Sequence, residues 1–229
     1  MSEIRIIPIE GVPDVLAGDD VALLIVDAAG DGTLLDGDVL VVTQKVVSKA
    51  EGRILPLDDK SAAIEAESKR VLRVGRTGMA ISETHLGFVC ANAGVVESIF
   101  EGDNIALLPV DPDASARRIR ARIKHLATVD VGVVISDTFG RAWRLGQTDV
   151  AIGVAGIQPF VDHVGGVDVY GKELVATRIA IADELAGAAE MVMGKAERIC
   201  AAIVRGAPAV PGPGAAVQIV RPAQDDLFR

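Results

Sequence analysis

The stretch Val131-Gly132-Val133-Val134-Ile135-Ser136-Asp137-Thr138 decides how this chain folds. Apolar residues fill most of positions 131–136, which is typical of a strand that is buried on both faces. Such a strand would deliver Asp137 and Thr138 to its C-terminal end. A second apolar stretch, at 39–43, follows the turn Asp36-Gly37-Asp38 and places polar groups directly after it, at 44–49. We therefore expect two buried strands that each end in polar side chains.

Capping residues mark the helices on either side of these strands. Asp19-Asp20 can cap a short helix, and Asp111-Pro112-Asp113 can open a second one, because acidic side chains accept hydrogen bonds from the first free amides of a helix. Residues 61–73 are also predicted to be helical. The longest helix should occupy 180–193 and end at Gly194, since glycine can adopt a left-handed conformation.

The remaining apolar segments predict short strands. These begin at Ile4 and recur near 79–81, 87–91, 105–109 and, after a Pro/Gly-rich loop at 207–215, at 217–220. Strands and helices alternate irregularly, so an α+β fold is favoured over a regular parallel α/β sheet. The sequence shows no internal repeat and no clear linker. We therefore treat 1–229 as a single unit, within which two interlocked subdomains are an open alternative.

Composition and charge narrow the class of protein. Half of the 229 residues are hydrophobic and only 3% are aromatic, so Val, Ile, Leu and Ala must build the core. The net charge of −9 argues against nucleic acid or an anionic membrane as the main partner. No signal-peptide pattern opens the chain, and no apolar run approaches the ~18 residues of a membrane helix. Cys90 and Cys200 lie in apolar runs, which is typical of reduced, buried thiols. We expect a cytoplasmic protein.

Asp137 is the strongest candidate for chemistry by its position. The chain has no P-loop, no Gly-x-Gly-x-x-Gly after a strand, no Gly-x-Ser-x-Gly elbow and no His-Glu-x-x-His site. A carboxylate after an apolar strand, followed by Thr138 and Gly140, suits a divalent cation that is bound to substrate phosphates. Arg141 and Arg144 could neutralise the same phosphates. The alternative, that Asp137 only caps a turn, stays open.

Other charged residues allow two interpretations each. Lys45, Lys49 and Arg53 follow a buried strand, and they would either meet anionic ligand groups or stay solvated. Asp183-Glu184 lies in an Ala-rich helix, where an acidic pair usually faces solvent, although its apolar neighbours leave little room for a broad polar face. The histidines share no metal-like spacing and are interpreted as structural or surface residues: His85, His125 and His163.

Short motifs extend along nearly the whole chain. In order, they are 10–13 (EGVP), 36–53 (DGDVLVVTQKVVSKAEGR), 87–94 (GFVCANAG), 107–113 (LLPVDPD), 136–144 (SDTFGRAWR), 183–186 (DELA), 193–195 (MGK) and 204–206 (VRG). Together they closely resemble the coenzyme F420:L-glutamate ligase family. The ending at 221–228 (RPAQDDLF) is similar to the junction at which some bacterial members continue into a nitroreductase-like flavin domain. We therefore expect the ligase part alone.

The resemblance implies a fold, a reaction and partners. The family fold is an unusual α+β arrangement of mixed and antiparallel sheets with packed helices, and it pairs into a homodimer. The implied reaction phosphorylates the terminal carboxylate of the deazaflavin precursor of coenzyme F420 with GTP, and the amine of L-glutamate then attacks the acyl phosphate. Two divalent ions, Mg²⁺ or Mn²⁺, are implied, with K⁺ as a further ion. This chemistry needs charge neutralisation and positioning more than a side-chain nucleophile.

The family motifs also assign residues to the site. Asp137 and Thr138 would hold metal, and Asp137 with Arg141 would act in catalysis. The GTP site would be lined by Glu10, Gly11, Val12, Pro13, Gln44, Lys45, Lys49, Met193, Gly194 and Lys195.

One loop departs from the family pattern. After Gly94 the family continues Ile/Val-Asp-x-Ser-Asn, which supplies a metal carboxylate and an asparagine that contacts the nucleotide. Here Val96 stands in place of the aspartate and Ile99 in place of the asparagine. Valine cannot bind a metal, so we expect Glu97 to replace the missing carboxylate. The segment 53–77 is also shorter than in the family. Two alternatives therefore stay open: a divergent paralogue that ligates another carboxylate or uses another nucleotide, and a nucleotide- or deazaflavin-binding protein without ligase activity.

Overall fold

The computed structural model of the chain describes residues 3–97 and 103–227, so Ile99 lies outside the described residues. Its centre is a five-stranded sheet in the order β1-β13-β2-β9-β10. The strands are β1 (Arg5–Ile9), β13 (Ala201–Arg205), β2 (Val39–Thr43), β9 (Gly132–Arg141) and β10 (Arg144–Ala155). Within this sheet β2 and β9 run parallel and the other neighbours pair antiparallel. The sheet is therefore mixed, which confirms the predicted α+β class.

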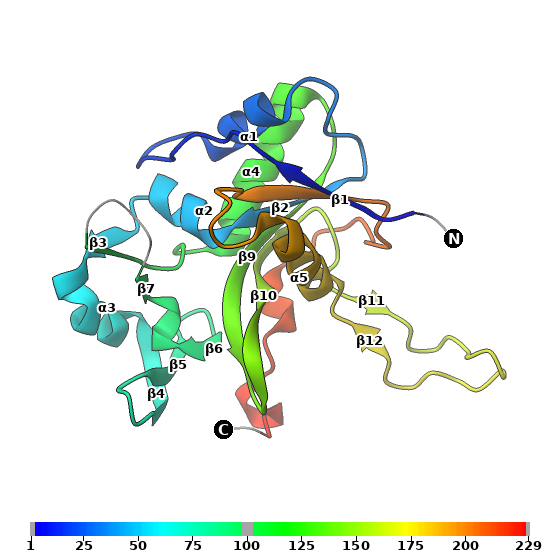
Figure 1. Cartoon of the computed structure of the whole chain (residues 1–229). Coiled ribbons are helices and arrows are strands. Elements are labelled where there is room, and N and C mark those ends of the chain that lie inside the picture. The colour runs from blue at the N-terminus through cyan, green and yellow to red at the C-terminus, as the bar shows by residue number, and fades with distance from the viewer. Residues whose placement is uncertain (1–2, 98–102, 228–229) are drawn as a thin grey trace.

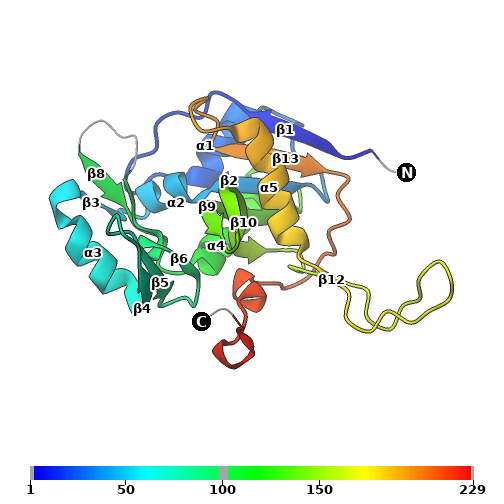
Figure 2. The ribbon, with the colours of Figure 1, turned by 60° about the horizontal axis from the view of Figure 1, so that its bottom comes forward.

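Helices cover both faces of this sheet (Figures 1 and 2). α1 (Val21–Ala29) and α4 (Pro112–Ala127) pack on one face, where Leu40 and Val42 point, and α5 (Ile181–Met193) packs on the other, where Val39 and Val41 point. All four of these strand side chains are almost fully buried. Successive side chains of a strand face opposite ways, so an unbroken apolar stretch fits a strand that lies between two helical layers.

The two predicted caps are present. The side chain of Asp20 accepts a hydrogen bond from the amide of Leu23, and that of Asp111 accepts one from the amide of Ala114. Asp111 caps α4, which has 16 residues, whereas α5 has 13. The prediction that 180–193 is the longest helix is therefore wrong. The arginines of α4 are strong helix formers, which favours a helix of this length.

A smaller lobe lies beside one edge of the central sheet (Figure 1). Two three-stranded sheets form it, one of β3 (Ile54–Pro56), β8 (Asn104–Ala106) and β7 (Val96–Glu97), the other of β4 (Ser68–Val74), β5 (Ala80–Thr84) and β6 (Val89–Ala91). α3 (Lys60–Glu67) packs against them around a small core of Ala63, Val95, Ile105 and Leu107. α2 (Gln44–Ala50) joins this lobe to β2.

Two local predictions are wrong. The helix expected at 61–73 ends at Glu67, because the chain then enters β4 and pairs with β5; here long-range pairing outweighs helical propensity. The strand expected at 217–220 is instead a 3-10 turn, Ala216–Ile219. Asp113 holds the start of this turn by accepting hydrogen bonds from the amides of Ala216 and Val217.

The segment around β11 (Val161–Asp162) and β12 (Arg178–Ile179) forms an arm that extends away from the body (Figures 1 and 2). Several apolar side chains of this arm are exposed, with Val169 and Tyr170 each 92% exposed. The remaining short 3-10 turns are Leu57–Asp59, Asn92–Gly94 and Ala223–Asp225. Among the described residues, we find no helix that is both long and apolar enough to span a membrane.

Candidate functional site

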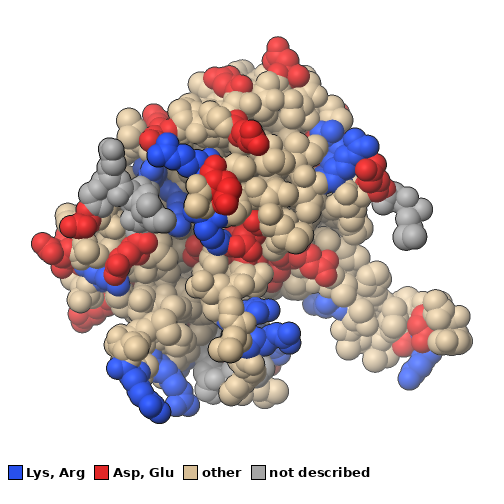
Figure 3. All heavy atoms as spheres, in the orientation of Figure 1, with Lys and Arg blue, Asp and Glu red and all other residues tan. Residues whose placement is uncertain are grey.

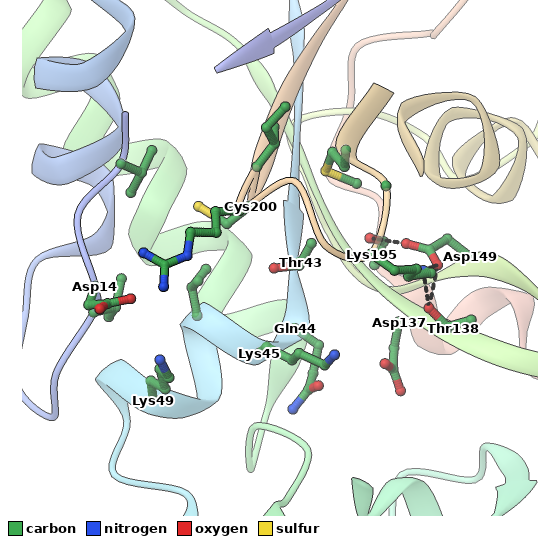
Figure 4. Close-up of a pocket in the computed structure, with 18 of the residues that line it drawn as sticks. Asp14, Thr43, Gln44, Lys45, Lys49, Asp137, Thr138, Asp149, Lys195 and Cys200 are labelled. Carbon is green, nitrogen blue, oxygen red and sulfur yellow. Dashed lines mark hydrogen bonds and ion pairs between the residues drawn. The ribbon is translucent and has the colours of Figure 1, made fainter. Parts of the chain in front are cut away.

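A cavity of about 320 Å³ opens where β2 passes into α2, between the β9–β10 hairpin and the loop after α5 (Figure 4). In Figure 3, basic and acidic side chains meet on this face over α2 and the neighbouring strands. Its lining residues are Val12, Pro13, Asp14, Val15, Thr43, Gln44, Lys45, Val46, Lys49, Ser136, Asp137, Thr138, Asp149, Met193, Gly194, Lys195, Arg198, Ile199 and Cys200. We call this cavity the first cavity.

The parallel pairing of β2 and β9 brings the polar segments after the two apolar stretches together. Thr43 lies opposite Ser136 in this register, so the residues that follow each of them face one region. The polar segment 44–49 lies in the helix α2, which begins directly after β2. A helix projects Lys45 and Lys49 from the same side, because residues four apart lie one turn above the other.

Gln44 anchors this helix in the core. Its side chain is fully buried, and its Nε2 donates to the carbonyl oxygen of Leu107 at 2.9 Å and to Ser48 Oγ at 2.5 Å. Its Oε1 has no hydrogen-bond partner among the described residues. Buried polar atoms are almost always paired, so an acceptor left unpaired in the lining of a cavity points to a ligand or a water there.

The sequence predicted a strand that ends just before Asp137, and this prediction is wrong. β9 continues to Arg141 and turns back into β10, so Asp137 and Thr138 lie within a long hairpin. This pairing places Asp149 directly opposite Thr138. Asp149 is 3% exposed, and it accepts hydrogen bonds from Ser136 Oγ at 2.9 Å and Thr138 Oγ1 at 2.6 Å. The hairpin thus buries a second carboxylate beside the first.

The pKa of Asp137 is raised to about 7, chiefly by burial and also by the nearby charge of Asp149. The amide of Thr138 and the ammonium groups of Lys45 and Lys195 act in the opposite direction, since they favour the ionised carboxylate. In Figure 4 the Lys45 amine and the Asp137 carboxylate point into the same part of the cavity.

Lys195 links the two strands of the hairpin to α5. Its Nζ donates to Thr138 Oγ1 at 2.7 Å and lies 3.2 Å from Asp149 Oδ1 and 2.9 Å from Glu190 Oε1. Gly194 permits the turn that brings Lys195 to these partners. It ends α5 with a positive φ of 60°, and a Cβ there would clash with the carboxylate of Glu197. The turn that the sequence predicted at the end of this helix is therefore confirmed.

Further polar residues of the first cavity were not predicted as site residues, namely Asp14, Thr43, Ser136, Asp149 and Arg198. Asp149 could have been found, because it directly precedes the apolar run at 150–155, where a charge without a partner is costly. Arg198 gives no such signal, since it lies in a polar loop with a positive φ of 58°. Cys200 also lines the cavity, but burial raises the pKa of its thiol to about 11, and that of Cys90 to about 12. Neither thiol is a nucleophile in this setting.

The residues predicted for the site come together in part. Val12, Pro13, Gln44, Lys45, Lys49, Met193, Gly194, Lys195, Asp137 and Thr138 all line the first cavity. Glu10 and Gly11 precede this group and are exposed outside its lining. Arg141 lies near the tip of the hairpin, where it donates to the carbonyl oxygen of Leu145 at 2.8 Å.

Glu97 lies at a second cavity, of about 280 Å³. Asp137 and Thr138 line this cavity as well, so the two cavities meet at these residues. The Glu97 carboxylate forms an ion pair with Lys60, and its side chain is 59% exposed. Its assignment as a metal ligand stays a prediction.

The donor set at the first cavity fits a hard divalent cation. Asp137 and Asp149 are buried carboxylates, and Ser136 and Thr138 add hydroxyl oxygens. Within the described residues, no group of three or more His, Cys, Asp or Glu side chains could hold a metal ion. The protein would thus offer one or two carboxylates, and phosphate oxygens and water would complete the ligand set, as is usual for Mg²⁺.

Comparison with known proteins identifies similar enzymes along nearly the whole chain. The family model described as F420-0:Gamma-glutamyl ligase matches residues 11–206. A coenzyme F420:L-glutamate ligase of Methanothermobacter thermautotrophicus is 42% identical, over 99% of this chain and 99% of the relative. Enzymes of the same name from Methanopyrus kandleri and Archaeoglobus fulgidus are 41% and 36% identical, each over 99% of this chain and over 98% and 96% of their own lengths.

Proposed function

This chain belongs to the F420-0:gamma-glutamyl ligase family, and from that premise we propose that it adds L-glutamate to the deazaflavin precursor of coenzyme F420, with GTP as co-substrate. The observation that carries the proposal is the first cavity, where two buried carboxylates lie among three lysines. Mixed charge of this kind suits a metal-bound triphosphate better than a neutral ligand.

The proposed reaction proceeds in two steps. A carboxylate oxygen of the precursor attacks the γ-phosphorus of GTP; a P–O bond to the acyl group forms, the bond to GDP breaks, and GDP leaves with the electron pair. The nitrogen of L-glutamate then attacks the acyl carbon. A C–N bond forms, phosphate leaves with the C–O electron pair, and the nitrogen loses a proton. A γ-linked chain can grow by repetition.

The cations of the first cavity would position the phosphates. Lys45 and Lys49 project from α2, and Lys195 reaches in from the turn after α5. Charge-assisted contacts of this kind contribute about 1.5–3 kcal/mol each. Glu10, Gly11, Val12 and Pro13 would lie along the same nucleotide, and Arg141 would act from the hairpin tip. These roles are proposals that the family motif and the lining support.

Asp137 and Thr138 are proposed to hold Mg²⁺ or Mn²⁺, and Asp149 joins them as the neighbouring carboxylate. When bound, divalent ions would neutralise charge on the phosphate oxygens, and two such ions with an accessory K⁺ match the family expectation. Lys195 holds Asp149 and Thr138 in place from the other side.

We also propose that the protein acts as a cytoplasmic homodimer. The arm at 161–179 supports this, because it leaves apolar side chains in water that a second copy could cover, namely Val164, Val167, Val169, Tyr170 and Val175. Size-exclusion chromatography with light scattering tests the dimer, and a monomer at micromolar concentration would contradict it.

An assay of the purified chain with precursor, L-glutamate, GTP and Mg²⁺ or Mn²⁺ tests the activity. Formation of a glutamylated product and GDP is the expected result. GTP turnover with other carboxylate acceptors alone would favour the divergent paralogue, and binding without turnover would favour a carrier of nucleotide or deazaflavin.

A further inference from the structure

The second cavity shares Asp137 and Thr138 with the first and approaches them from the smaller lobe. Its other lining residues come from the segment at 90–97, from the β9–β10 hairpin and from α3, and they are Lys60, Cys90, Ala91, Asn92, Gly94, Val95, Val96, Glu97, Phe139, Gly140 and Gln147. A molecule in this cavity would meet the reacting groups of the first cavity across the Asp137–Thr138 pair.

The wall of the second cavity is held in an unusual backbone conformation. Asn92, Ala93 and Gly94 all have positive φ, at 50°, 54° and 75°. For residues other than glycine this conformation costs on the order of 1–3 kcal/mol and persists where the surrounding structure enforces it. Packing enforces it here, since a Cβ on Gly94 would come within 2.6 Å of the Leu108 side chain. Strained backbone of this kind is found at binding sites, so we interpret this wall as part of one.

The second cavity carries charges of both signs. Among the described residues of its lining, Lys60 is the single Lys or Arg, its side chain is 31% exposed, and it forms an ion pair with Glu97. Asp137 supplies a second carboxylate outside this ion pair. A ligand with a carboxylate for the lysine and an ammonium group for Asp137 would match this set. A free α-amino acid has both groups, whereas the deazaflavin precursor offers carboxylate and phosphate charge without an ammonium group.

We propose that the second cavity binds the incoming L-glutamate and that Lys60 binds one of its carboxylates. In the absence of substrate Glu97 forms the ion pair with Lys60, and the substrate carboxylate replaces it. This inference rests on the proposed ligase function and names the subsite for the second substrate. The amino group of the bound glutamate then faces Asp137 and Thr138, on the side from which it can reach an acyl phosphate formed in the first cavity.

The Glu97 substitution separates this role from that of a metal ligand. In Glu97→Gln the lysine loses its internal partner, so the KM for L-glutamate should fall about threefold. If Glu97 held a metal, the same variant would lose metal-dependent turnover. A loss of turnover would therefore overturn the proposal.

The Lys60 substitution tests the contact directly. Lys60→Ala should raise the KM for L-glutamate about tenfold and leave the KM for GTP within about twofold, and Lys60→Arg should restore much of the loss. Lys69→Ala is the matched control, because Lys69 also belongs to the smaller lobe and pairs with a glutamate, Glu83, at 3.1 Å, yet lines neither cavity. An unchanged KM for L-glutamate in Lys60→Ala, or a rise in the KM for the precursor instead, would overturn the proposal.

A measurement of L-glutamate binding tests the proposed subsite without relying on ligase activity. Calorimetry of L-glutamate with the parent chain, a non-hydrolysable GTP analogue and Mg²⁺ should show binding that Lys60→Ala weakens about tenfold. Product formation by the parent together with unaltered glutamate binding in the variant would leave the ligase function standing and refute the subsite. A parent that binds glutamate through Lys60 but forms no product would refute the ligase function and keep the subsite.

Discussion

The Asp137→Asn variant should gain stability relative to the parent as the pH rises between the ordinary and the folded pKa of Asp137. Asp137 is 8% exposed, and its carboxyl is buried beside Asp149. The pKa of this carboxyl in the fold is about 7, against an ordinary value of 3.8, and burial is the main cause. The unfolded chain releases the proton at lower pH than the folded chain does. Ionisation of Asp137 therefore opposes folding, and it does so most strongly above the folded pKa.

The size of the effect follows from the two pKa values. Each unit of pKa difference corresponds to about 1.4 kcal/mol, so a rise from 3.8 to about 7 costs the fold at most about 4 kcal/mol above the higher pKa. The folded state binds more protons than the unfolded state between the two pKa values, so stability is lost as the pH rises through this window and then levels off. From pH 5 to pH 8 the cost should grow by about 2–3 kcal/mol in the parent and not in the asparagine variant.

Urea unfolding of both proteins at pH 5 and pH 8, without divalent metal, measures this difference. Asp14→Asn is the matched control, because Asp14 lines the same cavity but is exposed, so it controls for the change in net charge. Mg²⁺ at pH 8 should stabilise the parent and leave the Asp137 variant almost unchanged. A parent-to-variant difference that stays constant between the two pH values would refute the reasoning about the buried carboxylate.

Three further predictions concern the first cavity and its surroundings. Lys45→Ala and Lys49→Ala should each weaken GTP binding about tenfold or more in calorimetry, because each removes a charge-assisted phosphate contact; parent-like binding by both would make them ordinary surface lysines. Gly194→Ala should weaken GTP binding by a similar factor, since the strained turn would displace Lys195, and an unaltered affinity would show that the turn does not position this lysine. Val96→Asp should raise Mn²⁺ affinity by adding a hard oxygen donor at the second cavity, and an unchanged affinity in a titration followed by electron paramagnetic resonance would count against a missing ligand there.

The central fold followed from the sequence where local signals agreed with the tertiary structure. The stretches 39–43 and 131–136 were apolar on both faces, and both became inner strands between two helical layers. Asp20 and Asp111 capped helices because a cap depends on its own few residues. The errors at 61–73 and 217–220 occurred where distant partners decide: β5 recruits the first segment and Asp113 holds the second.

The site was predictable as a set of residues and less so as a geometry. Family motifs identified most of the lining, and the apolar strand before Asp137 identified its central carboxylate. No pattern in the sequence indicated that β9 would run on past Ser136 to form a hairpin, so the neighbouring carboxylate Asp149 was missed. Cross-strand pairing brings these two carboxylates together, and the 11 residues between them in the sequence conceal it.

The position of Asp149 beside Asp137 in the buried hairpin is the strongest physical argument that this cavity is a site. Two carboxylates in a buried hairpin repel one another, and Lys195, with its side chain 54% exposed, offsets only part of that repulsion. A core selected for stability alone would replace one of them with an apolar residue, since unpaired buried charge is among the costliest features of a fold. A bound divalent cation reverses the balance, because the same two carboxylates then become ligands. The repulsion between these two carboxylates is thus what a binding site for a cation and its phosphates would be expected to show.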